Sequence, residues 1–403
     1  YLTGEPQITF FKVVYRRHTN FAIESIKQTF NGTANWSSEV SATIARNGDL
    51  VTGMHLEVSL PAPTGSQYYT DAVGHYLIDE ATLSIGGQKI DKHYGMWLEL
   101  WDELTGTSEK KVGYDAMVGK ETGWAASQQL GQDASGALVG ESVAVTVYVP
   151  LQFWFNRNPG LALPLIALQY HEVKLDIKFA SNAATVEVAA LGDLSGGDVS
   201  GAGTAAGDIL GAALYVDYIY LDTEERRRFA QMSHEYLIDQ LQYQTEAVST
   251  GNPKPRLTFN HPVKELVWAQ VASASKSASD YFNFGTGLSD ASGAHGPITK
   301  AVLQLNGHDR FSSRNGAYFR YVQPYYHHTR IPTKPVYSYS FALRPEEHQP
   351  SGTCNFSRID NAILDVNMSA DAGAAPAGVL HIFAVNYNVL RVVSGMGGLA
   401  YSN

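Results

Sequence analysis

"EVKLDIKF" (residues 172–179) and "NAILDVNM" (361–368) are the two stretches that decide the fold. In the first, apolar and charged side chains alternate, so that two faces separate: Val173, Leu175, Ile177 and Phe179 on one, Lys174, Asp176 and Lys178 on the other. A period of two with one charged face is typical of a half-buried antiparallel strand. The second stretch repeats the pattern and shares a Leu-Asp pair, at 175–176 and 364–365. The sequence therefore predicts two related strands, one in each half of the chain.

The same alternation runs through much of the chain. It recurs in four further stretches: "GMHLEVSL" (53–60), "SVAVTVYV" (142–149), "ALYVDYIYL" (213–221) and "PVYSYSFAL" (335–343). Clusters of Gly, Pro and Asn separate these stretches, as expected between the strands of sandwiches or barrels. The sequence thus predicts an all-β protein.

Two more pairs of stretches suggest an internal duplication. "SIGGQKIDKHYG" (84–95) is similar to "QLNGHDRFSSRNG" (304–316), and "VDYIYL" (216–221) is similar to "VNYNVL" (385–390). One such pair is weak support, but three pairs in the same order indicate two copies of one β-fold.

Few helices are expected, and two stretches each predict one. "GMWLELWDELTG" (95–106) places Trp97, Leu100, Trp101 and Leu104 on one apolar stripe that ends before a glycine. "LDTEERRRFAQ" (221–231) begins with Asp222, followed three residues later by Glu225, a spacing typical of a helix N-terminus. We expect this second helix to join the two copies. The long segments 183–213 and 271–297 are poor in large apolar residues, and we expect exposed loops there.

Composition narrows the class of protein. A chain of 403 residues has room for two domains. Its net charge of −10 argues against a general nucleic-acid coat, and its single cysteine, Cys354, rules out a disulfide within the chain. It contains no run of about 18 apolar residues that would predict a membrane span. Because the sequence starts with Tyr1 rather than Met, we expect that a short N-terminal segment is missing.

The search for catalytic, cofactor-binding and metal-binding residues predicts none. The phosphate-loop motif, paired cysteines, the H-E-x-x-H motif and the G-x-S-x-G elbow are all absent from the sequence. The neighbours His327 and His328 could bind a metal, but a solvated loop is the preferred interpretation. The basic residues Arg16 and Arg17 could contact nucleic acid, or they could form salt bridges within or between subunits; the acidic chain favours salt bridges.

The chain resembles the major capsid proteins of nucleocytoplasmic large DNA viruses, and most closely those of the algal viruses, the phycodnaviruses. The resemblance rests on stretches along nearly the whole chain: "YLTGEPQITFFKVVYRRHTNFAIESIKQTFNG" (1–32), "ARNGDLVT" (45–52), "IGGQKIDKHY" (85–94), "NPGLALPLIALQYHEVKL" (158–175), "VDYIYLDTEERRRFAQ" (216–231), "HEYLIDQLQ" (234–242), "QPSGTCNFSRIDNA" (349–362) and "NYNVLRVVSGMGGLAY" (386–401). The departures, at 105–140, 183–213 and 271–298, concern surface decoration rather than the fold.

The resemblance implies a double jelly roll, that is, two tandem eight-stranded antiparallel jelly rolls with short helices in the loops and the linker. With the helix described above as the linker, the expected boundaries are 1–221 for the N-terminal jelly roll, 222–233 for the helical linker and 234–403 for the C-terminal jelly roll.

The resemblance also implies a structural role in the virion, with assembly in the host cytoplasm. The expected unit is a homotrimer, a pseudo-hexagonal capsomer that tiles an icosahedral shell. The implied partners are neighbouring capsomers, minor capsid and penton proteins, a nearby internal viral membrane and glycans on the surface loops, with no direct contact to nucleic acid. Five residues are candidates for interfaces: Arg16 and Arg17 at the base of the first jelly roll, and Tyr281, Phe282 and Phe284 in a long loop. For the three aromatic residues, packing within their own loop is the open alternative.

Two other functions remain as alternatives. One is a minor double jelly-roll capsid paralogue, which copy number in the virion would distinguish. The other is a carbohydrate-binding or carbohydrate-processing β-sandwich, since jelly rolls also serve as lectins and glycosidases. A glycosidase needs two carboxylates facing one another, and the strand acids Glu57, Asp176 and Asp365 form no obvious pair. We therefore expect that the protein is not an enzyme.

Overall fold

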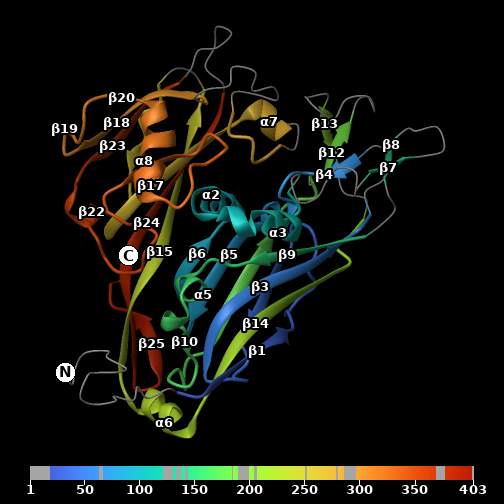
Figure 1. Ribbon diagram of the computed structural model, residues 1–403, viewed down its shortest axis with the longest axis vertical. Helices are drawn as coiled ribbons and strands as arrows, with labels where there is room; N and C mark the ends of the chain where they lie inside the picture. Colours follow the sequence, from blue (N-terminus) through green and yellow to red (C-terminus); the bar gives the residue numbers. More distant parts are fainter. Residues whose placement is uncertain are drawn as a thin grey trace, which may run out of the picture.

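The computed structural model describes residues 19–62, 67–120, 130–132, 138–140, 144–183, 185–188, 199–203, 207–249, 252–277, 280–285, 296–368 and 377–401 (Figure 1). We call the elements from β1 to β14 the N-half and those from β15 to β25 the C-half. The two halves lie side by side, and α6 (Thr223–Gln231) lies at one end of the molecule, where the chain passes from one half to the other.

Each half contains two main antiparallel sheets. In the N-half, the first sheet has the order β1 (Phe21–Gln28), β14 (Gly211–Leu221), β3 (Leu50–Leu60), β10 (Leu163–Pro164), with β9 (Val145–Pro150) also paired to β3. The second has the order β2 (Glu39–Thr43), β11 (Val173–Phe179), β5 (Ile78–Ile85), β6 (Gln88–His93). The N-half core lies between them, because Leu56 and Leu214 of the first sheet share one apolar cluster with Leu83 and Leu175 of the second.

The C-half repeats this arrangement. Its first sheet has the order β15 (His234–Val248), β24 (Gly378–Val393), β17 (Pro262–Ala272), β21 (Tyr337–Ser340), with β22 (Cys354–Asn355) paired to β17 and β25 (Met396–Leu399) to β24. Its second has the order β16 (Arg256–Leu257), β23 (Ala362–Met368), β18 (Ile298–Leu305), β19 (His308–Asp309), with β20 (Arg314–Asn315) paired to β18. Strands β4 (Gln67–Tyr69), β12 (Thr185–Val188) and β13 (Val199–Gly203) form a small sheet, and β7 (Leu130–Gln132) pairs with β8 (Leu138–Gly140).

The related sequence stretches occupy matching strands. β11, which carries "VKLDIKF", lies between β2 and β5, and β23 lies between β16 and β18 in the same way. The hairpin turns match as well: Gly86 and Gly87 have φ of 57° and 81°, and Asn306 and Gly307 have φ of 51° and 80°. Two successive residues with positive φ are the signature of a two-residue hairpin, which glycine and asparagine tolerate best.

The third pair of stretches is shifted by one residue. "VDYIYL" and "VNYNVL" lie on the matching strands β14 and β24, but Val216 faces the N-half core, whereas Val385 faces outward from the C-half core. A shift of one residue reverses the face of every side chain, so this similarity does not represent structural equivalence residue by residue.

Both expected helices are present. α2 (Gly95–Thr105) ends at Gly106, and Asp222 accepts a hydrogen bond from the Thr223 N–H at the start of α6. The other helices are short, apart from α3 (Ser108–Val118): they are α1 (Val73–Tyr76), α5 (Trp154–Arg157), α7 (Ser273–Ser277), a π-helix (Tyr318–Val322), α8 (Gln323–His327) and the 3₁₀ turns Pro159–Leu161 and Phe356–Arg358.

Two loop expectations are wrong in part. The segment 271–297 is not exposed throughout, because Phe282 and Phe284 are buried. The expected solvated loop at His327 and His328 is also wrong: His327 ends α8, and the His328 side chain is only 1 % exposed. In both places the residues that bury these side chains are distant in the sequence, so the local composition did not indicate the burial.

Candidate functional site

The apolar stripe of α2 joins the two halves. Trp97, Trp101 and Leu104 are buried, and they belong to one apolar cluster with Val267 and Phe383 of the first C-half sheet. The rings of Trp97 and Phe383 lie 5.4 Å apart. A helix of the N-half therefore covers one face of a C-half sheet (Figure 1).

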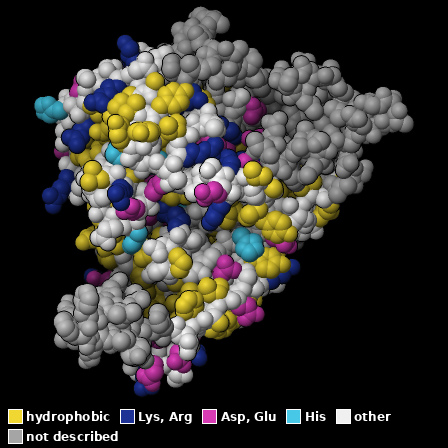
Figure 2. Space-filling model, in the orientation of Figure 1, with side chains coloured by type: hydrophobic (Ala, Val, Ile, Leu, Met, Phe, Trp, Pro, Cys, Tyr) yellow, Lys and Arg dark blue, Asp and Glu magenta, His cyan; other side chains and the backbone are white. Residues whose placement is uncertain are grey.

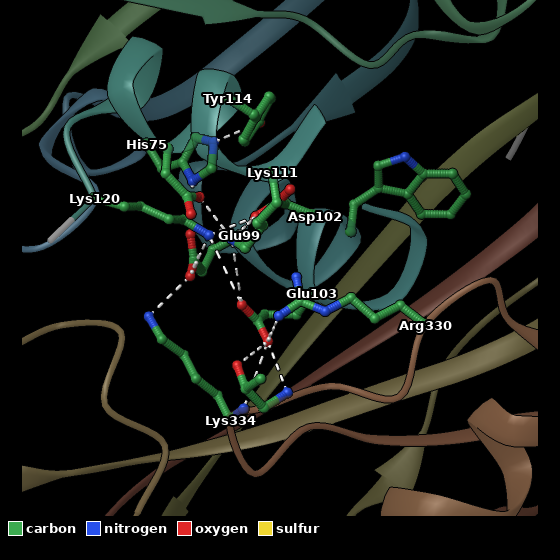
Figure 3. Close-up of polar contacts among 12 residues, drawn as sticks. His75, Glu99, Asp102, Glu103, Lys111, Tyr114, Lys120, Arg330 and Lys334 are labelled. Carbon is green, nitrogen blue, oxygen red and sulfur yellow. Dashed lines mark hydrogen bonds and ion pairs between the residues drawn. The ribbon is translucent and has the colours of Figure 1, made fainter. Parts of the chain in front are cut away.

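The opposite side of α2 is acidic and also buried. Glu99, Asp102 and Glu103 follow the spacing i, i+3, i+4, which places them together on a helix, and they are 0 %, 6 % and 2 % exposed. Buried carboxylates are tolerated only when cations and hydrogen-bond donors compensate them. We call these three residues and those around them the junction cluster: Asp71, His75, Glu99, Asp102, Glu103, Lys111, Tyr114, Asp115, Lys120, Arg330, Thr333 and Lys334. Figure 3 labels these residues except Asp71, Asp115 and Thr333.

Lys334 connects the C-half to this acidic helix. Its ammonium lies 2.9 Å from Glu99 Oε1 and 3.0 Å from Asp71 Oδ2. The other Glu99 oxygen lies 2.8 Å from His75 Nδ1, and His75 Nε2 lies 2.8 Å from the Tyr114 hydroxyl. Glu99 is thus held from both halves at once.

Two lysines of the N-half complete the compensation of Asp102. Lys120 Nζ lies 2.5 Å from Asp102 Oδ2 and 3.0 Å from Glu99 Oε1. Lys111 Nζ lies 3.1 Å from the same Asp102 oxygen and 2.6 Å from Asp115 Oδ1. Helix α3, which carries Lys111 and Asp115, is thereby fixed against α2.

Glu103 holds the segment that leads to Lys334. Its Oε2 accepts hydrogen bonds from the Thr333 N–H at 2.9 Å and from the Thr333 hydroxyl at 2.7 Å. The Arg330 guanidinium lies 4.0 Å from the same oxygen, and the backbone N–H of Arg330 donates a hydrogen bond to the Leu104 carbonyl. Backbone and side chains of residues 330–334 therefore dock along α2.

The electrostatics favour the charged forms. Burial opposes ionisation of Glu99, but Lys334, Lys120 and His75 outweigh it and hold the pKa of that carboxyl well below its usual value. Burial also opposes the charge of Lys334, and here Asp71, Glu99 and Glu103 outweigh it and raise the pKa well above the ordinary lysine value. Glu99 and Lys334 therefore both stay charged across the physiological range, and their ion pair fixes the two halves to one another.

A second ionic contact joins the halves at Asp239 of β15. Its Oδ2 lies 2.9 Å from Lys264 Nζ of β17 and 3.2 Å from Arg157 Nη2 of the N-half helix α5. Lys264 is fully buried, which lowers its pKa despite the neighbouring Asp239. The Arg157 guanidinium also lies 4.7 Å above the Trp101 ring, so this contact adjoins α2.

His328 bridges two carboxylates of the C-half. Its Nε2 lies 3.2 Å from Glu265 Oε2 of β17, and its Nδ1 lies 3.0 Å from Glu346 Oε1. Burial lowers the pKa of His328, but the two carboxylates more than compensate and raise it to about 9. The histidine is therefore a cation at neutral pH, and it fixes the segment around Glu346 to the sheet.

The residues expected at interfaces fall into two groups. Arg16 and Arg17 lie outside the described residues. Phe282 and Phe284 are 4 % and 0 % exposed and belong to the same apolar cluster as Trp97. Tyr281 stacks on Tyr76, with ring centroids 4.4 Å apart, and donates to the Ala183 carbonyl. For the aromatic residues, this placement corresponds to packing within the chain, here between its halves.

The junction cluster was missed in the sequence, although a signal was present. The prediction for the helix 95–106 rests on its apolar stripe alone and makes no use of the acidic residues at i, i+3 and i+4. Three carboxylates on a helix with two tryptophans on the other side leave little solvated surface. That composition is the hint that both faces are buried.

The arrangement suits mechanical coupling rather than chemistry on a ligand. Each carboxylate on α2 is in contact with at least one cation. Within the described ranges, no group of three or more His, Cys, Asp or Glu side chains could hold a metal ion. Nor is any helix in that part of the chain long and apolar enough to cross a membrane.

Comparison with protein families gives matches along the chain. A model described as "Major capsid protein N-terminus" matches residues 9–222, and one described as "Large eukaryotic DNA virus major capsid protein" matches residues 225–398. The chain is similar to the major capsid protein of Pyramimonas orientalis virus, with 50 % identity over 426 residues that cover 100 % of this chain and 96 % of that protein. It is 42 % identical to the major capsid protein of Paramecium bursaria Chlorella virus 1, covering 100 % of this chain and 96 % of that protein.

Solved structures give the same result. The chain resembles the subunit in the quasi-atomic model of the PBCV-1 virus capsid, with a TM-score of 0.78 and 39 % identity, covering 98 % of this chain and 100 % of that one. The Faustovirus major capsid protein shares the fold at 14 % identity, with a TM-score of 0.74 and coverage of 97 % and 93 %.

Proposed function

Because this chain belongs to the large eukaryotic DNA virus major capsid proteins and is a structural protein of the virion, we propose that it forms a homotrimeric, pseudo-hexagonal capsomer. Such capsomers, side by side, tile the icosahedral shell. The observation that carries the proposal is the pair of matching halves: two β-sandwiches, joined where α2 covers one face of a C-half sheet, present two similar building units per chain. Three chains then supply six units, and cyclic symmetry closes the ring.

The finer architecture in this proposal is two tandem eight-stranded jelly rolls, with boundaries at 1–221, 222–233 and 234–403. The mostly β structure with few helices, and its likeness to viral capsid proteins, support it. So does the strand pairing, since two sheets of four strands can be drawn in each half: β1-β14-β3-β9 with β2-β11-β5-β6, and β15-β24-β17-β21 with β16-β23-β18-β19. The α6 helix between β14 and β15 is the linker.

The remaining partners belong to the same proposal. Arg16 and Arg17 form salt bridges with acidic neighbours or with minor capsid proteins at the base of the capsomer. Penton proteins and an internal membrane lie next to the shell, and glycans attach to surface loops. The protein acts as a scaffold and not as an enzyme, which its family and its compensated carboxylates support.

Light scattering on the purified protein, with negative-stain images of the same peak, tests this function. We expect a mass three times the 43.9 kDa of the chain and particles with hexagonal outlines. A stable monomer under all conditions, including co-expression with other virion proteins, would contradict the proposal.

A further inference from the structure

The duplication gives α2 a counterpart in the C-half, the helical segment 318–327. Each helix has at its start a glycine that packs against the first residue of a matching strand. A Cβ on Gly95 would lie 2.6 Å from the carbonyl oxygen of Ile78, which begins β5, and a Cβ on Gly316 would lie 2.0 Å from that of Ile298, which begins β18. Three residues after each glycine, Leu98 and Phe319 enter the core of their own half. The two helices therefore take the same place in the two halves.

The sheets that these helices could cover differ in burial. In the C-half, every residue of β17 from Val263 to Ala272 is buried, because α2 covers the face that points away from the core. In the N-half, the matching strand β3 alternates, with Met54 to Leu60 buried at every second residue and only half-buried residues between them. The outward face of the N-half sheet thus has no such cover within the described chain.

We call this surface the open sheet face, defined by outward residues of four strands: Phe21, Ile23, His55, Glu57, Tyr148, Tyr215 and Asp217. It includes large exposed apolar side chains, since Phe21 is 63 % exposed and Ile23 58 %. A face with several exposed aromatic and aliphatic residues is typical of a surface that another protein covers.

The counterpart helix is likewise uncovered. We call its outward surface the α8 patch, defined by Val322, Tyr325, Tyr326 and Leu343, which are 39 %, 69 %, 71 % and 72 % exposed. His327 keeps Leu343 beside the helix, because its Nδ1 lies 3.0 Å from the Leu343 carbonyl oxygen. Hydrophobic side chains gather over α8 in Figure 2. Counted from the glycines, Val322 and Tyr325 match Trp101 and Leu104, which α2 buries against the C-half sheet.

We propose that the α8 patch of one copy packs on the open sheet face of the next copy, repeating between chains the contact that α2 makes within the chain. This inference rests on the proposed homotrimer and names its interface. The contact is head to tail, because it joins two different surfaces of the same chain. Repeated around a ring it closes at three copies, with six sandwiches in alternating N-half and C-half order.

The shape and charge of the two surfaces are complementary. A hollow of about 350 Å³ on the open sheet face is lined by residues that include His55, Met117, Tyr148 and Asp217. This hollow accommodates the Tyr325 ring of the next copy, and the Tyr325 hydroxyl can donate a hydrogen bond to the Asp217 carboxylate. The hollow stays open because residue 53 is a glycine: a Cβ there would lie 2.1 Å from Asp217 Oδ2.

The signs of the charges in this contact match those of the contact between the halves of one chain. Arg344, 73 % exposed and paired with Glu347 at 2.9 Å, follows Leu343 of the α8 patch. The open sheet face offers the carboxylates of Glu57 and Asp217, with the cation Lys27 of β1 opposite Tyr215. Within the chain, the cation Lys334 of the C-half likewise meets the carboxylate Glu99 of the N-half. In both contacts the C-half supplies the cation and the N-half the anion.

Mass measurements on variants test the interface. The wild-type chain is measured first, and a trimer establishes the proposed function independently of its interface. Tyr325→Asp and Tyr148→Asp should each weaken association more than about tenfold, because buried aromatic residues dominate interface energetics. The control is Tyr170→Asp, since Tyr170 is 75 % exposed, close to the 69 % of Tyr325, lies on neither surface, and its substitution should leave the trimer intact.

A cross-linking experiment decides the question even where an aspartate variant fails to fold. Cys354 is replaced by Ser, Tyr325→Cys and Tyr148→Cys are combined in one chain, and a short bismaleimide is added. Bands of two and three chains from the two-cysteine protein, with none from either single-cysteine protein, would support the proposal. If the wild-type chain is a trimer but the two-cysteine protein gives no such bands, the proposed interface is wrong and the trimer remains. The same conclusion follows if both aspartate variants are still trimers. A wild-type chain that never associates would overturn both.

Discussion

Lys334→Met is the most informative perturbation of the junction. The substitution introduces an apolar side chain of similar length and removes the ammonium that contacts Glu99 and Asp71. Breaking a fully buried ion pair costs about 3–5 kcal/mol, because a charge is left uncompensated. Here Lys334 is 24 % exposed, and Glu99 keeps Lys120 at 3.0 Å, so we expect the lower end of that range, about 3 kcal/mol.

Differential scanning calorimetry measures this loss. If the whole chain unfolds together, unfolding entropy of about 2 cal/mol/K per residue converts 3 kcal/mol into a fall in Tm of about 3–4 °C. The matched control is Lys178→Met, since Lys178 pairs with Asp79 at 2.6 Å but the two side chains are 50 % and 47 % exposed. That exposed pair should contribute less than about 1 kcal/mol.

A second substitution checks the reason for the loss. Glu99→Gln in the Lys334→Met background removes the carboxylate that has lost one of its two lysine partners, so the double variant should regain part of the lost stability. Equal and small shifts for Lys334→Met and Lys178→Met would refute the reasoning, because they would mean that solvent screens the junction cluster as it screens a surface pair.

Three further predictions concern separate features. The pKa of His328 is raised to about 9, so its contribution to stability is complete below the unfolded pKa near 6.5 and is lost as pH rises through 9. The free energies of unfolding of wild type and His328→Gln should therefore converge as pH rises from about 6.5 to about 9. Trp97→Ala should cost about 3–5 kcal/mol in chemical denaturation, whereas Val112→Ala, at a site 69 % exposed, should stay within about 0.5 kcal/mol. Gly316→Ala should lower Tm, because its Cβ would lie 2.0 Å from a backbone oxygen, while Gly113→Ala, with nothing within 4 Å, should stabilise α3 by about 0.5–1 kcal/mol. A Gly316 variant as stable as wild type would contradict the close approach.

Strands and turns could be predicted because their signals are local. The alternation around Leu56 and Leu175 follows from one buried face, and the turn at Asn306-Gly307 follows from backbone conformations that those residues tolerate. The apolar stripe of α2 was predicted for the same reason. In each case neighbouring residues contain the whole physical cause.

The junction could not be predicted in this way. Glu99 and Lys334 are 235 positions apart, and nothing near either residue shows that both become buried. His328 was assigned to a solvated loop because its two carboxylate partners, Glu265 and Glu346, are brought to it only by folding. A charged residue is read as exposed unless its partner is known, and here the partners come from other elements.

The acidic face of α2 also distinguishes the two helix contacts. Counted from the glycines, Glu99, Asp102 and Glu103 correspond to Arg320, Gln323 and Pro324, so the C-half helix carries no carboxylates there. α2 on the open sheet face would separate Glu99 from Lys334, and a buried carboxylate that has lost this cation would oppose that pairing. The C-half helix on the C-half sheet would leave Lys334 without Glu99.

The two contacts are therefore built alike but cannot be exchanged, and they should fail separately. Lys334→Met should lower Tm while the mass stays that of a trimer, because the lost ion pair lies within the chain. Tyr325→Asp should lower the mass and change the Tm of the dissociated chain little, because Tyr325 is 69 % exposed in a single copy. If either variant lost both properties together, the stability of each chain would depend on its neighbours, and the sandwiches of the ring would form one cooperative unit.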